Sequence, residues 1–142
     1  MKKFKMIEHT ADIGIDVYGS TVLDLFVHSA KGMFAIISGN ANTKIEEDFS
    51  CEVNLQGEDF EDMLVTWLSE LLFICETKRV ILTSFNIGKV SKHHIEAGVK
   101  GRKIEHLGLK IEKEIKAVTY HNLEIKKNKI TGIWQTRIIF DI

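Results

Sequence analysis

The sequence has 142 residues, of which 44% are hydrophobic and 27% are charged. These values are typical of one globular domain with a substantial core, so we expect residues 1–142 to form a single domain. The formal net charge of −1 excludes a strong general attraction to nucleic acid, and RNA would be contacted weakly or through a partner protein. No leader and no apolar stretch of about 18 residues is present, which predicts a cytoplasmic protein without a membrane span.

The first third of the sequence predicts two short strands followed by a helix. Strands are expected at residues 4–8 and 13–18, because apolar residues alternate with small or polar ones along the second of them. The Ser-Thr pair at 20–21 can cap a helix, whose apolar residues recur at helical spacing between 23 and 37. Gly39 is expected to end that helix.

A second amphipathic helix is the strongest secondary-structure signal in the sequence. A strand is predicted before it, over residues 44–55, where apolar residues alternate towards the end. Glu58 and Asp59 then place negative charge where the helix dipole favours it, at a helix N-terminus. From 60 to 75 the large apolar residues follow the helical period, which indicates a core helix and not a cofactor-binding segment.

The remainder of the sequence is rich in strand signals, and Asn128 is expected at the turn of a hairpin. Two helices and about seven strands predict an α+β fold. We expect a two-layer domain with both helices on one face of a largely antiparallel sheet. The later strands are predicted at Val80–Ile87, His94–Val99, Lys116–Tyr120, Asn122–Lys126 and Trp134–Ile139.

Well-known catalytic motifs are missing from the sequence, including a Gly-rich phosphate loop, a nucleophile elbow and a zinc-protease helix. The basic segment Gly98–Lys103 is predicted to be a solvated turn, with a phosphate-facing patch as the alternative. Six histidines are scattered along the chain, and each is more typical of a surface or structural residue than of a catalytic one. His121 lies close to a predicted strand boundary.

Two aspartates are better candidates for chemistry. Asp12 lies in a polar break between the first two strands, where it is either a turn former or a ligand. Asp141 follows the apolar run 138–140, which predicts a buried central strand that holds its end in place. If the two carboxylates meet, their repulsion costs on the order of 1–4 kcal/mol. A hard divalent cation removes that cost, and oxygen from the final residue, Ile142, would complete a site that favours Ca²⁺ or Mg²⁺ over Zn²⁺.

Several motifs together resemble the archease family. They span residues 4–142 in the family's order, and residues 81–109 are the least similar. The motifs are His9-Thr10-Ala11-Asp12-Ile13-Gly14, the Glu58-Asp59 start of the helix with Trp67, Leu68 and Glu70-Leu71-Leu72, the segment Lys116-Ala117-Val118-Thr119-Tyr120-His121, and Phe140-Asp141-Ile142.

The resemblance implies a protein that assists the tRNA-splicing RNA ligase and is not itself an enzyme. That GTP-dependent ligase joins a 2′,3′-cyclic phosphate or 3′-phosphate end to a 5′-hydroxyl end, and the family speeds its guanylylation and multiple turnover. The resemblance also implies a divalent-metal site formed by Asp12, Asp141 and Ile142. Ca²⁺ is the expected ion, with Mg²⁺ or Mn²⁺ as alternatives, while His9 and Thr10 belong to the motif without being ligands.

Three other functions stay open on the sequence. The first is a metal-dependent phosphoesterase or nuclease that uses Asp12 and Asp141 with His9 or His121 as acid–base group. The second is the chaperone-like modulation of an RNA methyltransferase, which some relatives of the family suggest. The third is a generic binding module or chaperone without a metal role. Activity of the isolated protein on RNA would favour the first, and stimulation that needs the ligase would favour the accessory role. The oligomeric state is open, and a homo-oligomer is one alternative.

Overall fold

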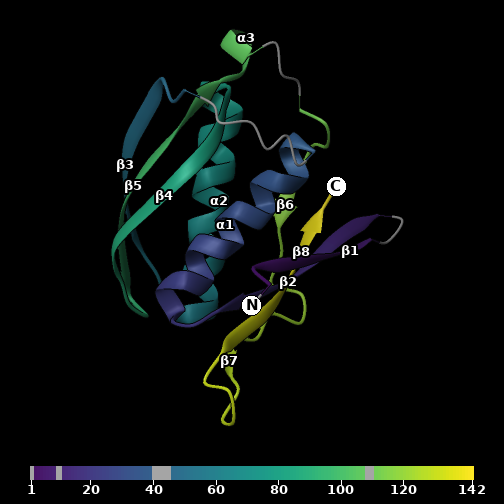
Figure 1. The fold of residues 1–142 in the computed structure, drawn as a ribbon, viewed down its shortest axis with the longest axis vertical. Coiled ribbons are helices and arrows are strands. Elements are labelled where there is room, and N and C mark those ends of the chain that lie inside the picture. Colours follow the sequence, from purple (N-terminus) through teal and green to yellow (C-terminus); the bar gives the residue numbers. More distant parts are fainter. Residues whose placement is uncertain (1, 9–10, 40–45, 108–110) are drawn as a thin grey trace.

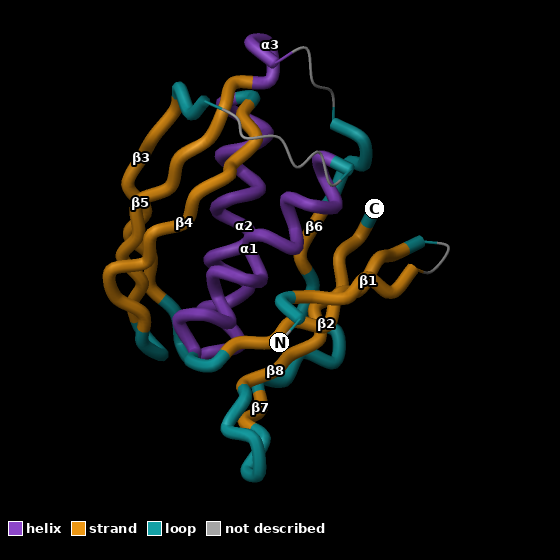
Figure 2. Tube along the Cα trace, in the orientation of Figure 1, coloured by secondary structure: helices purple, strands orange, loops and turns teal. Residues whose placement is uncertain are grey.

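The computed structural model describes residues 2–8, 11–39, 46–107 and 111–142 of the chain. Two antiparallel sheets lie on either side of a pair of helices, which gives three layers (Figure 1). Figure 2 shows the same arrangement, with orange strands flanking the purple helices. Among the described residues, no helix is both long enough and apolar enough to cross a membrane.

The larger sheet contains the first and the last strands of the chain. Its order is β1 (Phe4–Glu8), β2 (Asp12–Gly19), β8 (Trp134–Asp141) and β6 (Ala117–Val118), and β7 (Lys126–Lys127) also pairs with β8. The odd-numbered residues of β2 are buried and face the helices. β8 lies between β2 and β6, so it is a central strand, as its apolar run predicted.

The smaller sheet has three strands and lies on the other side of the helices (Figure 1). Its order is β3 (Phe49–Gln56), β5 (His94–Lys103) and β4 (Val80–Val90). A single helical turn, α3 (Ile104–Leu107), follows β5. Burial alternates along most of β5, so one face of this sheet packs on the helices and the other faces solvent.

The predicted signals at the helix ends are present in the structure. The hydroxyl of Thr21 accepts a hydrogen bond from the backbone N–H of Asp24 at 3.0 Å and caps α1 (Val22–Ser38). Gly39 ends that helix in the left-handed conformation, with φ 67°. The carboxylate of Asp59 caps the second helix, as the early negative charge predicted.

The two helices pack against each other through buried aromatic residues. Trp67 of α2 (Phe60–Lys78) is fully buried, and its indole N–H donates to the carbonyl oxygen of Phe26 in α1 at 3.1 Å. The ring of Phe85 in β4 lies 6.4 Å from the Trp67 ring in an edge-to-face arrangement. This aromatic cluster joins both helices to the smaller sheet.

The α+β class is confirmed, but the layers differ from the two-layer prediction, because the strands divide between two sheets. The buried residues of α1 explain this division. Phe34 reaches the ring of Phe85 in the smaller sheet at 5.8 Å. A Cβ added at Gly32, on another side of α1, would lie 2.8 Å from Ile15 in the larger sheet. A helix that is apolar on two sides needs a covering layer on each.

The prediction of a solvated turn at Gly98–Lys103 is wrong, because the segment lies within β5. Gly101 occurs there for steric reasons, since an added Cβ would lie 2.2 Å from the carbonyl oxygen of Ile81. The neighbouring strand also shifts register between Leu82 and Ser84. The glycine therefore permits a close approach of two backbones and does not mark a turn.

Other strand boundaries moved by several residues. The strand predicted from residue 44 begins at Phe49, and residues 44 and 45 lie outside the described part of the chain. The strands predicted at 116–120 and 122–126 are reduced to the two-residue strands β6 and β7. The hairpin turn at Asn128 is confirmed, since its backbone N–H donates to the carbonyl oxygen of Ile133 at 2.9 Å.

Candidate metal centre

The structure places Asp12 and Asp141 directly opposite each other in the larger sheet. β2 begins at Asp12, β8 ends at Asp141, and the antiparallel register pairs the two residues. Side chains of residues paired in this way project from the same face, with Cβ atoms about 4.5–5.5 Å apart. The register therefore places these two residues side by side, which the sequence analysis had set as the condition for a metal site.

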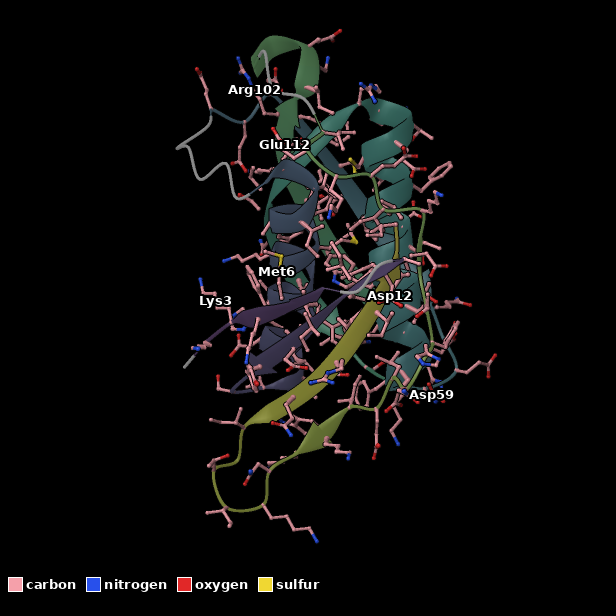
Figure 3. All side chains as sticks on the ribbon, turned by 90° about the vertical axis from the view of Figure 1, so that its right-hand side faces the viewer. Lys3, Met6, Asp12, Asp59, Arg102 and Glu112 are labelled. Carbon is pink, nitrogen blue, oxygen red and sulfur yellow. The ribbon has the colours of Figure 1, made fainter. Side chains whose placement is uncertain are left out.

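Both aspartates lie on the face of the sheet that points away from the helices. Their neighbours Ile13 and Phe140 are 2% and 0% exposed and pack into the core. Because side chains alternate along a strand, Asp12 and Asp141 project to the other side. In Figure 3 this part of the sheet faces the viewer, and Asp12 lies well above the hairpin at the bottom of the view.

The end of β8 is held between strands on both sides. Asp141 pairs with Asp12 of β2 and with Ala117 of β6. The backbone N–H of Lys116 also donates to the carbonyl oxygen of Asp141 at 2.8 Å. The side chain of Ile142 packs against the core. This segment is therefore fixed relative to Asp12, as an ordered ligand site requires.

Asp12 has a buried oxygen that lacks a partner. Its Oδ1 atom is inaccessible to solvent and forms no hydrogen bond, although the residue as a whole is half-buried. A buried acceptor without a partner costs about 1–3 kcal/mol, and more if it is charged. The like charge of Asp141 adds repulsion. A bound cation would satisfy the free oxygen and cancel the repulsion, so this residue pair fits a metal ion.

The available donors define the kind of ion that fits. Asp12 and Asp141 supply carboxylate oxygens, and Ile142 supplies backbone oxygens. Among the residues that the structure describes, no three or more His, Cys, Asp and Glu side chains are grouped closely enough to hold a metal. An ion at this position would therefore complete its coordination with backbone oxygens and water, as Ca²⁺ and Mg²⁺ do in proteins.

We call Asp12 and Asp141 the acidic pair. Of the two histidines in the sequence motifs, the structure describes His121 alone. His9 and Thr10 lie outside the described residues. His121 is exposed, and its backbone N–H donates to the Thr119 hydroxyl at 3.3 Å. The segment that starts at Ala117, opposite Asp141, runs away from Asp141 towards His121, since the backbone N–H of Thr119 bonds to the carbonyl oxygen of Ile139.

The same face carries an ion pair that the sequence analysis missed. Arg137 donates to both carboxylate oxygens of Asp16, at 2.7 and 3.0 Å, and this carboxylate raises the pKa of Arg137. The signal was available, because Asp16 follows Asp12 by four residues and Arg137 precedes Asp141 by four. Once the aspartates pair in antiparallel strands, Asp16 and Arg137 must also pair. The two residues line a polar hollow of about 340 Å³.

A second contact that the sequence analysis did not predict joins the loop after β6 to α2. The Tyr120 hydroxyl donates to Asp62 at 2.6 Å, although Tyr120 is 56% exposed. This hydrogen bond to an anion raises the pKa of Tyr120 to about 12 and lowers the pKa of Asp62. Close by, the backbone N–H of Ile125 donates to Glu61 at 2.9 Å. The loop after β6 is thus attached to the first turn of α2.

Comparisons with known proteins show what this chain is similar to. The model of the archease protein family matches residues 4–142. An archease of Methanosarcina mazei is 37% identical over 145 residues, which cover 99% of this chain and 97% of that protein. The solution structure of Methanobacterium thermoautotrophicum protein 1598 has a TM-score of 0.83 and 30% identity, with 100% of each chain covered. A Thermotoga maritima archease, described as a possible chaperone, shares the fold with a TM-score of 0.62, 24% identity and coverage of 97% and 96%.

Proposed function

Because the chain belongs to the archease protein family, we propose that it is a metal-binding accessory protein of an RNA ligase of the tRNA-splicing type. In this role it promotes the guanylylation of the ligase by GTP and its multiple turnover. The observation that carries the proposal is the register pair of Asp12 and Asp141, in which one buried carboxylate oxygen has no partner.

The residues of the acidic pair have distinct tasks in this proposal. Asp12 holds the metal with its buried oxygen, and Asp141 provides the second carboxylate from the opposite strand. Ile142 adds a backbone oxygen and is kept in place by its packing on the core. A bound divalent ion supplies a positive charge that attracts phosphate oxygens. The strand pairing presents that charge to the active site of the ligase, where metal ions and nucleotide are arranged.

An accessory role fits the acidic pair better than catalysis by this chain. A phosphoesterase or nuclease needs an acid–base group within hydrogen-bonding reach of the reacting atoms. His121, one histidine considered for that task, lies on a segment that runs away from Asp141. The T. maritima relative is described as a possible chaperone, which is consistent with action on a partner protein. The modulation of a methyltransferase and the cytoplasmic location stay predictions.

The test is a multiple-turnover ligation assay with the purified ligase and GTP. Its RNA substrates carry a 2′,3′-cyclic phosphate or 3′-phosphate end and a 5′-hydroxyl end. Asp12→Asn and Asp141→Asn replace a carboxylate with an amide of nearly the same shape, and each should abolish the stimulation of turnover. Glu52→Gln makes the same chemical change on the smaller sheet and should leave stimulation intact. Unchanged turnover in both aspartate variants would reject the proposal. RNA cleavage by the isolated protein with a divalent ion would favour the nuclease instead.

A further inference from the structure

β3 is an edge strand of the smaller sheet, and among the described residues no strand pairs with its outer side. The sheet has the order β3-β5-β4, so β3 pairs with β5 alone. Its eight residues pair without a register shift, whereas β4, at the other edge, shifts register twice. Irregular pairing makes an edge a poor template for a further strand, and a regular edge such as β3 is a good one.

The apolar side chains of β3 are incompletely covered. Val53 is 4% exposed. The other three residues that project from its face of the strand remain half-buried, namely Phe49, Cys51 and Leu55. On β5, which lies between β3 and β4, the residues of the corresponding face are buried. A strand added at the open edge would cover the apolar surface that β3 leaves exposed.

The backbone hydrogen bonds at the end of β3 identify the residues that face the open edge. The N–H of Gly57 donates to the carbonyl oxygen of His93 at 3.1 Å, in continuation of the register that pairs Gln56 with His94. Along an antiparallel strand, the backbone groups of successive residues point alternately to one side and to the other. The odd-numbered residues of β3 therefore bond to β5. The backbone N–H and C=O groups of the even-numbered residues point to the open edge, and these are Ser50, Glu52, Asn54 and Gln56.

A second copy of β3 is complementary to this edge in an antiparallel register centred on Val53. Glu52 of each copy then faces Asn54 of the other, so a carboxylate meets an amide. Ser50 faces Gln56 in the same way, and no like charges are opposed. All four residues have outward-pointing backbone groups. Each opposed pair therefore exchanges two hydrogen bonds, and the four pairs of two copies make about eight.

The same register also brings apolar side chains together on the face towards the helices. Cys51 of each copy faces Leu55 of the other, and both are half-buried in the single chain. Neighbouring registers fit less well. A centre at Glu52 opposes two negative charges, and a centre at Asn54 leaves Ser50 beyond the end of the second strand.

We propose that two copies of the chain form a two-fold symmetric dimer by antiparallel pairing of their β3 strands. The three strands from each copy then make one continuous sheet of six strands. Both surfaces of this interface belong to the same chain, as in the symmetric dimers that are the commonest protein oligomers. The inference does not rest on the proposed function, because the acidic pair belongs to the larger sheet, on the other side of the helices (Figure 1).

Sedimentation equilibrium of the full-length protein measures the association. Pairing of one strand from each copy is a small interface, so we expect a dissociation constant in the micromolar range. The mass should rise from 16.2 kDa towards twice that value between about 1 and 500 μM protein.

Charge substitutions test the register. Asn54→Glu would face Glu52 of the other copy at two places and should weaken association by about tenfold. Adding Glu52→Lys to this variant places opposite charges at both contacts and should restore association. Asn86→Glu is the matched control, because it adds the same charge to the same face of the sheet, at β4. The control should change the dissociation constant by less than about twofold.

A disulfide tests the register independently. Leu55→Cys would face Cys51 of the other copy in a pair without backbone hydrogen bonds, where Cα atoms lie about 4.5 Å apart and a disulfide can form. Oxidised glutathione should therefore give a covalent dimer of this variant on a non-reducing gel. Phe49→Cys adds a thiol to the same face but would lie opposite Gly57, so it should not cross-link. The wild type should not cross-link either, since its two Cys51 residues would be about 13 Å apart.

Each outcome decides the inference without touching the proposed function. A mass of 16.2 kDa at every concentration would overturn the dimer. A dimer that Asn54→Glu and Asn86→Glu weaken equally, or that Leu55→Cys fails to cross-link, would place the interface elsewhere and overturn the inference as well. A protein that stays monomeric, while Asn54→Glu lowers its affinity for the purified ligase, would assign this edge to the ligase. The role of Asp12 and Asp141 is decided separately, by the stimulation of ligation.

Discussion

The two sheets pack on the same pair of helices, but they differ in whether the carboxylates on their solvent-facing sides have hydrogen-bond partners. At the smaller sheet, Glu47, just before β3, accepts hydrogen bonds from the hydroxyls of two β4 residues, Thr83, at 2.7 Å, and Ser84. On the larger sheet, Asp12 keeps a buried oxygen without a partner and faces a second carboxylate. Polar groups that satisfy one another support a fold, whereas like charges held together leave a place for a ligand.

Arg102 shows that a missing hydrogen bond is not sufficient evidence by itself. Its Nε atom is also buried without a partner. The guanidinium nevertheless donates from Nη1 to the carbonyl oxygen of Glu46 at 3.1 Å and lies 3.5 Å from Asp48. Its charge is therefore compensated within the protein. The acidic pair differs because an unpartnered atom and an adjacent like charge occur at the same place.

The largest expected effect is a loss of stability when a glycine is replaced, and it should differ between one glycine of each sheet. Gly101→Ala should lower the free energy of unfolding by about 3 kcal/mol, because the new Cβ would lie 2.2 Å from the backbone oxygen of Ile81. Gly14→Ala should cost about 1 kcal/mol or less, because its nearest neighbour at 3.0 Å is the flexible end of Ile139. Urea unfolding measures both values. Equal losses would show that the two sheets are equally tight at these positions.

The second effect concerns metal-dependent stability. In a chelator, Asp12→Asn should be as stable as the wild type or more stable by about 1 kcal/mol, because it relieves repulsion with Asp141. Ca²⁺ at about one hundred times its dissociation constant should stabilise the wild type by about 2.7 kcal/mol and leave the variant unchanged. Thermal unfolding with and without Ca²⁺ measures this difference. The same Ca²⁺ response in both proteins would place the ion elsewhere.

The third effect concerns Glu47, whose carboxylate has hydrogen-bond partners and is therefore compared with Asp12. Glu47→Gln should cost about 0.5–1 kcal/mol at pH 7 and should not alter the response to Ca²⁺. The hydrogen bond from Ser84, and to a smaller extent that from Thr83, lowers the pKa of Glu47 below its ordinary value of 4.5. Its contribution to stability is therefore present above pH 4.5 and is lost as the pH falls through the lower folded-state value. Urea unfolding should show a larger deficit of the variant at pH 7 than at pH 3.

The smallest effect concerns the contact between the loop after β6, next to the larger sheet, and α2. Tyr120→Phe removes the hydrogen bond to Asp62 and should cost about 0.5 kcal/mol, because the pair is largely exposed. The bond raises the pKa of Tyr120 from 10 to about 12. Its contribution should be complete below pH 10 and disappear as the pH rises towards 12. Absorbance at 295 nm follows the phenol, and a Tyr120 titration near pH 10 would contradict the contact.

Much of the fold was predictable because its signals are local. The cap at Thr21, the stop at Gly39 and the early acidic residues of α2 depend only on their neighbours in the sequence. The apolar run that ends before Asp141 correctly indicated a central strand. The polar break at Asp12 and the apolar run before Asp141 made these two residues candidates, the family resemblance implied a metal site there, and the register of β2 and β8 pairs them.

The division into two sheets was not predictable in the same way, because it depends on contacts between distant residues. A helix such as α1 shows from its sequence that it is apolar, but not which strand will cover each side. The prediction of a turn at Gly98–Lys103 was wrong for a related reason. Glycine and charge together are typical of a turn, and only the approach of Ile81 explains Gly101 within a strand.

A crystal structure with Ca²⁺ tests the central claim most directly. The proposed site predicts one ion bound by carboxylate oxygens of Asp12 and Asp141 and by a backbone oxygen of Ile142, at the calcium–oxygen distances of about 2.3–2.6 Å. The anomalous signal of the ion identifies it independently of the refined coordinates. An ion bound elsewhere, or no ion between Asp12 and Asp141 at saturating Ca²⁺, would contradict the assignment of this pair as the metal centre.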